Sequence, residues 1–180
     1  DLPDLPTLLF FGSLSYEPNL AALDQLLRIV LPALELRLGR DGFQLLIAGG
    51  GLPETYRKLA DYRQRGVHYL GFVPDLTLLL QTADVLLNPV DTGAGIKTKV
   101  IDSLAGGLTV VSSRSGALGI DQSVCGGKLI VVPDGDTEAF TGAVVGVLER
   151  PYVSTPGSFY GVYSWRRIAE RVAAENSPLI

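Results

Sequence analysis

The chain has 180 residues, of which 47% are hydrophobic and 19% are charged, and its formal net charge is -4 at pH 7. Such a composition suits one compact domain, alone or cut from a larger protein, and it excludes a disordered chain. The negative balance excludes an overall electrostatic attraction to nucleic acid or anionic lipid, so any anion site must be local.

Short β-rich runs alternate with longer helical patterns in six units, which indicates a parallel sheet wrapped by helices. The predicted strands are residues 7–11, 43–48, 67–70, 84–88, 108–112 and 128–132. The predicted helices cover about residues 20–34, 53–64, 75–80, 98–105, 136–148 and 164–174, and 151–161 is interpreted as loop. The expected fold class is α/β: a Rossmann-like, doubly wound, mostly parallel six-stranded sheet with helices on both faces.

The cysteine content and the apolar runs bear on compartment and membrane. A single cysteine, Cys125, cannot form an internal disulfide, so we expect a reducing, cytoplasmic location and a small surface or half-buried side chain. The apolar runs are far shorter than the roughly 20 residues that cross a bilayer. The N-terminus lacks a signal peptide and the chain contains no Met, so we interpret the sequence as an excised piece.

In a doubly wound sheet, ligands bind beyond the carboxyl ends of the strands, where the strand order reverses. The loops that leave predicted strands are residues 12–18, 49–52, 71–74, 91–98 and 112–119. The first of them begins with Gly12 and Ser13, which have N–H and hydroxyl donors for a phosphate, although a plain turn fits the pattern equally well.

The strongest candidate site is the run from Asp91 to Asp102, a glycine-containing loop that opens a helix. Glycines let the backbone approach an anion, and a helix start adds free N–H groups and partial positive charge. Lys97 and Lys99 can neutralise a diphosphate, and Asp102, near the same helix face as Lys99, can accept hydrogen bonds from a sugar diol. The alternative is a solvated loop with a Lys99–Asp102 surface pair.

Other nucleotide motifs do not fit. Ile96 precedes Lys97 and the loop follows the fourth strand, so residues 93–98 are not a P-loop. The glycines of 49–51 lack G-x-G-x-x-G spacing, and no acidic residue ends the next strand, so nicotinamide binding is not expected.

Metal and triad chemistry is also disfavoured. One His and one Cys cannot build a metal cluster or a nucleophile pair, and His68 is interpreted as a packing residue of a strand rather than as a catalyst. The Asp134-Gly-Asp136 pattern predicts a turn and a helix cap rather than a cation site. We therefore expect no cofactor and no required metal.

Taken in order and spacing, the motifs of the chain resemble the carboxyl-terminal, donor-binding domain of family 4 (group 1) retaining glycosyltransferases, which adopt the two-domain GT-B fold. The motifs that carry the resemblance are Leu8-Leu-Phe-Phe-Gly-Ser-Leu14 with Glu17-Pro-Asn19, Leu45-Leu-Ile-Ala-Gly-Gly-Gly51, Val67-His-Tyr-Leu-Gly-Phe-Val-Pro-Asp75, Ala83-Asp-Val-Leu-Leu-Asn-Pro89, Gly95-Ile-Lys-Thr-Lys-Val-Ile-Asp-Ser-Leu-Ala-Gly-Gly107, Thr109-Val-Val-Ser-Ser113 and Tyr163-Ser-Trp165.

The resemblance implies a crevice in which this half holds a nucleotide-sugar, and it assigns roles to three groups of residues. The implied donor phosphate-binding residues are Gly12, Ser13, Gly95, Ile96, Lys97, Thr98 and Lys99. The resemblance implies that Asp102 binds the ribose hydroxyls and that Gly71, Phe72 and Val73 bind the base.

Two positions depart from the family pattern. The Glu-x7-Glu motif of the family would place its first glutamate at Ala94, and its second position holds the shorter Asp102. Many members carry an arginine after the first-strand glycine, where this chain has Ser13. The lysine pair of the helix loop is a possible substitute for that arginine.

The activity that the resemblance implies is transfer of a hexose from a nucleotide-diphosphate sugar to a saccharide, lipid or other acceptor, as in polysaccharide biosynthesis. Residues 1–180 then form a single donor domain, the amino-terminal acceptor domain is absent, and the isolated chain is expected to be inactive. Trp165 would face that domain. The expected partners exclude nucleic acid, and any peripheral membrane association would run through the missing half.

Three alternatives stay open from the sequence. A degenerate domain would bind a nucleotide or a partner protein without catalysis. A nucleotide-sugar epimerase of the same fold would release a free altered sugar. A flavodoxin-like regulatory domain is the third alternative, but the acidic pocket it needs after the first strand is not visible.

Overall fold

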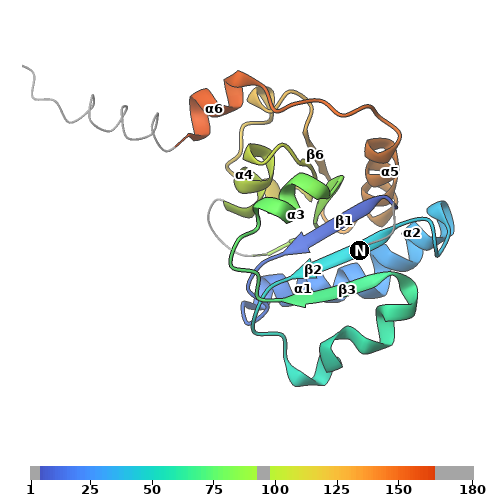
Figure 1. Cartoon of the computed structure of the whole chain (residues 1–180). Coiled ribbons are helices and arrows are strands. Elements are labelled where there is room, and N and C mark those ends of the chain that lie inside the picture. The colour runs from blue at the N-terminus through green and yellow to red at the C-terminus, as the bar shows by residue number, and fades with distance from the viewer. Residues whose placement is uncertain (1–4, 93–97, 165–180) are drawn as a thin grey trace, which may run out of the picture.

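The computed structural model describes residues 5–92 and 98–164 (Figure 1). Its six strands form one sheet in the order β3-β2-β1-β4-β5-β6, and every neighbouring pair is parallel. The strands are β1 (Thr7–Phe11), β2 (Gln44–Ala48), β3 (Val67–Gly71), β4 (Val85–Asn88), β5 (Thr109–Ser113) and β6 (Leu129–Val132). The strand order reverses between β1 and β4, so the predicted fold class is confirmed.

Strand β1 lies at the centre of the sheet and is buried along its whole length. Leu8 is in register with Leu45 of β2 on one side and with Val85 of β4 on the other. The sequence of a parallel strand that is covered on both faces is a continuous run of apolar residues. For this reason the strands could be located from the sequence.

The pleat of the strands divides the core into two layers. Leu8 and Phe10 of β1 pack with α1 (Glu17–Gln25), α2 (Leu31–Leu38) and α5 (Thr137–Leu148). On the other face, Leu9 and Phe11 pack in the layer that contains α3, α4 and α6. These helices are α3 (Thr77–Thr82), α4 (Thr98–Ala105) and α6 (Gly157–Tyr163). Figure 1 shows α1 and α2 on one side of the strands and α3 and α4 on the other.

The first helical stretch is longer than predicted and contains a wide turn. A π-helical turn, Leu26–Val30, joins α1 to α2, and the Leu31 amide donates to the Leu26 carbonyl five residues back. Pro32 follows at once; it has no N–H for the carbonyl of Arg28, and its ring would clash with that group in a regular helix. The wide turn accommodates this proline while keeping the predicted apolar stripe inside.

The connection from β2 to β3 corrects one prediction. A continuous helix was expected over residues 53–64, but Glu54–Arg65 forms 3₁₀ turns broken by a left-handed stretch. Arg57, Lys58 and Leu59 have φ values of 48, 53 and 57°. This reversal places Leu59 in the core at 1% exposure, and that burial compensates for the unfavourable backbone.

Two predictions near the C-terminal part are also corrected. The predicted loop over 151–161 is helical from Gly157, where α6 begins, because Phe159 buries its ring against the second core layer and Pro156 precedes the first turn. Cys125 is fully buried rather than at the surface or half-buried, and its thiol donates to the Asp121 carbonyl. Neither outcome follows from the local pattern, since both depend on elements packed against them. Trp165 and the predicted helix over 164–174 lie, apart from Ser164, outside the described residues.

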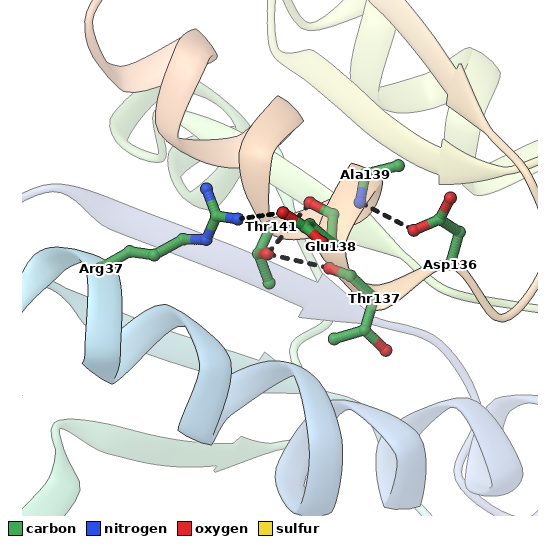
Figure 2. Close-up of polar contacts among 6 residues, drawn as sticks. All are labelled: Arg37, Asp136, Thr137, Glu138, Ala139 and Thr141. Atoms are coloured by element: carbon green, nitrogen blue, oxygen red, sulfur yellow. Dashed lines mark hydrogen bonds and ion pairs between the residues drawn. The ribbon is translucent and has the colours of Figure 1, made fainter.

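The N-terminus of α5 has the predicted cap (Figure 2). The Asp136 carboxylate accepts from the Ala139 amide at 2.9 Å, which satisfies one free N–H of the first turn. The Glu138 carboxylate faces the Arg37 guanidinium of α2 at 3.7 Å, so the two helices also meet at the surface. The helix-cap prediction for the Asp134-Gly-Asp136 pattern is confirmed at Asp136.

Lys58 offers a test of the left-handed turn. Each L-residue in this conformation costs about 1–2 kcal/mol, and glycine avoids that cost. We expect Lys58→Gly to raise the free energy of unfolding by about 1 kcal/mol, measured by urea denaturation. Lys58→Ala keeps a Cβ and should give no gain; equal stability of the two variants would contradict the assigned backbone.

The ion pair of Arg65 with Glu35 makes stability depend on pH. Both guanidinium bonds to the carboxylate are 2.7 Å long and hold the pKa of Glu35 below its ordinary value of 4.5. The Glu35 carboxylate therefore takes up a proton more readily in the unfolded chain than in the folded one. The stabilisation that this ion pair gives is present above pH 4.5 and is lost as the pH falls through the folded-state pKa of Glu35.

We expect Glu35→Gln to cost about 2 kcal/mol at neutral pH, with the deficit shrinking in strong acid. Urea denaturation of both proteins across the acid range measures this difference. Asp61→Asn is the control, because its ion pair with Arg57 is exposed and should contribute little. A pH-independent deficit for Glu35→Gln would contradict the assignment.

Candidate functional site

The loops that leave β1, β2 and β3 are joined to one another at the carboxyl edge of the sheet. The Gly12 amide donates to the Ala48 carbonyl at 3.0 Å, and the Gly49 amide donates to the Gly71 carbonyl at 2.7 Å. The Tyr69 hydroxyl also donates to the Gly49 carbonyl. These bonds continue the sheet beyond the strands and hold the three loops as one rigid surface.

A cavity of ≈ 290 Å³ opens on this surface. It is lined by Phe11, Gly12, Ser13, Ser15, Ala48, Gly49, Gly50, Phe72, Val73 and Leu76. Four predicted residues, from two separate loops, therefore meet here: Gly12 and Ser13 for phosphate, Phe72 and Val73 for the base. The Phe72 ring is 77% exposed and offers a flat apolar face at the rim.

Two glycines at this edge of the sheet have no room for a side chain. A Cβ on Gly49 would lie 1.9 Å from the Gly12 carbonyl oxygen. A Cβ on Gly12 would lie 2.7 Å from Nδ2 of Asn19. Glycine at both positions is thus a steric requirement of the site's floor.

Helix α4 reaches this floor through Lys99. The Lys99 ammonium donates to Oδ1 of Asn19 at 2.7 Å and lies 5.1 Å from the centre of the Phe10 ring. Nδ2 of Asn19 in turn donates to the Ser13 carbonyl at 2.9 Å. Lys99 is therefore connected, through one buried amide, to the loop that the sequence assigned to the phosphates.

The other predicted residues of α4 lie closer to solvent. Thr98 and Asp102 are exposed, and partial loss of hydration raises the pKa of Asp102 above its ordinary value. The ion pairs of the described ranges do not include one between Lys99 and Asp102. Lys99 reaches across to α1 instead of pairing along its own helix.

Several predicted residues lie outside the described part of the chain. These are Gly95, Ile96 and Lys97, together with Ala94. Their roles stay predictions. Gly71 is described: it ends β3, and its carbonyl accepts the Gly49 amide, so it joins the base loop to the site's floor.

Asn19 is the residue that sequence reasoning missed. It stood in the Glu17-Pro-Asn19 motif without a role. Its position in the first turn of a helix that follows a glycine loop was the available signal. That signal was insufficient, because its partner Lys99 is 80 residues away in the chain.

A larger cavity of ≈ 590 Å³ lies at the opposite, amino edge of the sheet. Lys128 lines it and is 3% exposed, but its ammonium donates to the carbonyls of Gly107 and Val153 and lies 4.6 Å from the centre of the Tyr152 ring. Burial lowers the pKa of Lys128. Lys128 joins the chain after α5 to the sheet, so the charge of this lysine has a structural role.

The described residues hold neither a cluster of metal ligands nor a membrane-spanning helix. Within 5–92 and 98–164, no group of three or more His, Cys, Asp or Glu side chains is arranged to hold a metal ion. His68 lies half-buried on β3, in register with Leu46. In those ranges no helix combines the length and apolar character needed to cross a bilayer.

With this geometry in place, comparison with known proteins gives the family. A family model described as glycosyl transferases group 1 matches residues 5–150. The chain belongs to this family. The predicted resemblance is confirmed, although no curated protein shows a significant match.

Solved structures share the fold at low sequence identity. Alr3699/HepE of Anabaena, solved in complex with UDP, is 13% identical with a TM-score of 0.66, over 95% of this chain and 49% of that one. WaaG, a glycosyltransferase involved in lipopolysaccharide biosynthesis, is 19% identical with a TM-score of 0.62, over 99% and 45%. A glycosyltransferase from Rickettsia africae ESF-5 is 15% identical with a TM-score of 0.63, over 82% and 38%. The chain thus matches less than half the length of each.

The steric requirement at the site's floor can be tested with a matched pair of glycines. Gly49→Ala places a Cβ against a backbone oxygen that cannot move freely, so we expect a loss of roughly 2–3 kcal/mol of unfolding free energy. Gly146, inside α5, has open space around it, and Gly146→Ala should stabilise by about 0.5–1 kcal/mol. Thermal or urea denaturation measures both; a neutral Gly49→Ala would refute the close loop contact.

Proposed function

We propose that this chain is the donor-binding domain of a retaining glycosyltransferase. It holds a nucleotide-diphosphate sugar while a hexose passes to a saccharide, lipid or other acceptor, as in polysaccharide biosynthesis. The observation that carries the proposal is the Lys99 ammonium, tied through Asn19 to the Gly12–Ser13 loop at the point where the strand order reverses.

The proposed chemistry is electrostatic. When a glycosidic bond to a diphosphate breaks, negative charge develops on the leaving phosphate, and a preorganised cation lowers the energy of that state. Lys99 and the start of α4 supply positive charge, and Lys97 adds a second cation. These groups do the work for which other enzymes use a divalent ion, so the proposed reaction requires no metal or cofactor.

The cavity that Gly12 and Ser13 line suits the rest of a nucleotide. Phe72 and Val73, which line this cavity, offer apolar contact to a base. Asp102 is exposed on α4, outside that lining, and would accept hydrogen bonds from ribose hydroxyls. Structural likeness adds support, since the Anabaena protein was solved with UDP and also with UDP-glucose.

We infer that the catalytic crevice is completed by a second, amino-terminal domain that carries the acceptor. Tyr16, Phe72 and Leu118 follow β1, β3 and β5 at the same edge of the sheet, and their side chains are 49%, 77% and 65% exposed. Apolar side chains grouped around a ligand edge are typical of an interdomain face.

Several consequences follow from this inference. Residues 1–180 alone would bind donor without turnover. Any contact with membrane would be made by the other domain, nucleic acid would play no part, and the enzyme would work in the cytoplasm.

The test is calorimetric titration of the chain with UDP, GDP and ADP, each in EDTA and in magnesium. We expect one diphosphate to bind equally well in both conditions. Lys99→Met should weaken it about tenfold or more, because the ion pair with phosphate is lost. Asp102→Asn should weaken it less, since an amide still accepts from ribose.

Lys58→Met is the matched control, because it removes an exposed cation from the β2–β3 connection and should bind like the wild type. Failure of every diphosphate to bind the folded chain would contradict the proposal. Binding that needs magnesium would contradict the metal-free mechanism alone.

A further inference from the structure

We propose that Asn19 is a positioning residue that makes this site select phosphate-bearing ligands, by holding the Lys99 ammonium at a set place beside the Gly12–Ser13 loop. The inference rests on the proposed function and deepens it. It assigns the selectivity for phosphate to a residue of α1 that need not touch the ligand itself.

The bonds of Asn19 determine its orientation. An ammonium only donates and a carbonyl only accepts, so Oδ1 must face Lys99 and Nδ2 must face Ser13. The two distances are 2.7 and 2.9 Å. One side-chain amide thus bridges helix α4 and the loop that follows β1, and neither bond survives if the side chain turns over.

Asn19 is buried at the start of α1 and is held both by this helix and by the loop before it. It is 8% exposed and stands in the first turn of α1, where its amide donates to the Tyr16 carbonyl at 3.0 Å. Further along the same helical stretch, the core contains the buried side chains of Leu23, Leu26, Leu27 and Val30. The side-chain amide of Asn19 also fills the space that a side chain on Gly12 would need. The bridge is therefore rigid before any ligand arrives, and such preorganisation is what makes an electrostatic site effective.

The neutrality of Asn19 is the feature that matters for selectivity. An aspartate at this place would also accept from Lys99, but it would form an ion pair, and its second oxygen would face the Ser13 carbonyl without a proton between them. Asparagine orients the ammonium and adds no negative charge of its own. The nearby Phe10 ring adds a favourable electrostatic contact without contributing negative charge as a carboxylate would.

The experiment compares ligands with and without phosphate. Uridine, UDP and inorganic pyrophosphate are titrated into the wild type, Asn19→Asp and Asn19→Ala. We expect Asn19→Asp to weaken UDP and pyrophosphate at least tenfold while uridine binding changes less than twofold. Asn19→Ala should weaken the two phosphate ligands by an intermediate factor, because the lysine keeps its charge but loses its position.

Gln64→Glu is the control for net charge, because it adds the same negative charge at an exposed position of the β2–β3 connection and should leave all three affinities unchanged. Thermal melts of each variant report the fold. Asn19→Asp is nearly isosteric, so it keeps the test informative if Asn19→Ala does not fold.

The outcomes separate the two proposals. If the wild type binds UDP or pyrophosphate but Asn19→Asp binds them equally well, the role of Asn19 is overturned and the donor site stands. Equal weakening of uridine and UDP would indicate a merely structural residue and would also overturn it. If neither phosphate ligand binds the folded wild type, the proposed function fails, and the selectivity assigned to Asn19 fails with it.

Discussion

The hydrogen bond between Lys99 and Asn19 crosses the end of the sheet from one face to the other. Asn19 belongs to α1, which covers the same face as Phe10, whereas Lys99 belongs to α4 on the opposite face. Two helices from opposite layers can meet only where the strand order reverses, because there the connections leave β1 and β4 in different directions. The topology therefore creates the place where a phosphate-binding group can be assembled from distant parts of the chain.

Helix α4 is held by hydrogen bonds at both ends, and these bonds fix the position of Lys99. At its C-terminus the carbonyls of Leu104 and Ala105 accept from the hydroxyls of Thr155 and Tyr160. These carbonyls have no partner within the helix, so the segment after α5 acts as its cap. Lys128 fixes that segment in turn by donating to a carbonyl within it. The chain that leads to α6 thus supports the site from the far end of the helix.

The floor of the site is rigid for a different reason. Backbone hydrogen bonds between three loops replace the side-chain contacts that usually hold loops in place, and Gly12 and Gly49 allow the chains to approach to that distance. A backbone surface of this kind can approach a diphosphate closely without side chains in the way. The cavity with Phe72 at its rim extends from this floor toward the edge where apolar side chains are exposed.

The sequence by itself determined the parallel α/β sheet, its six strands, and the loops that carry the site. It could do so because buried parallel strands are continuous apolar runs and because a helix cap is signalled by a local residue such as Asp136. Motif order was enough to predict the family.

Only the tertiary structure decided which residues meet. Asn19 and Lys99 have no local signal, because their contact depends on the direction in which two helices leave the sheet. The left-handed turn that includes Leu59, helix α6 and the burial of Cys125 likewise arise from packing between elements that are distant in sequence. Local pattern reports how a segment buries its own apolar side chains, whereas these features are stabilised by what another segment places against them.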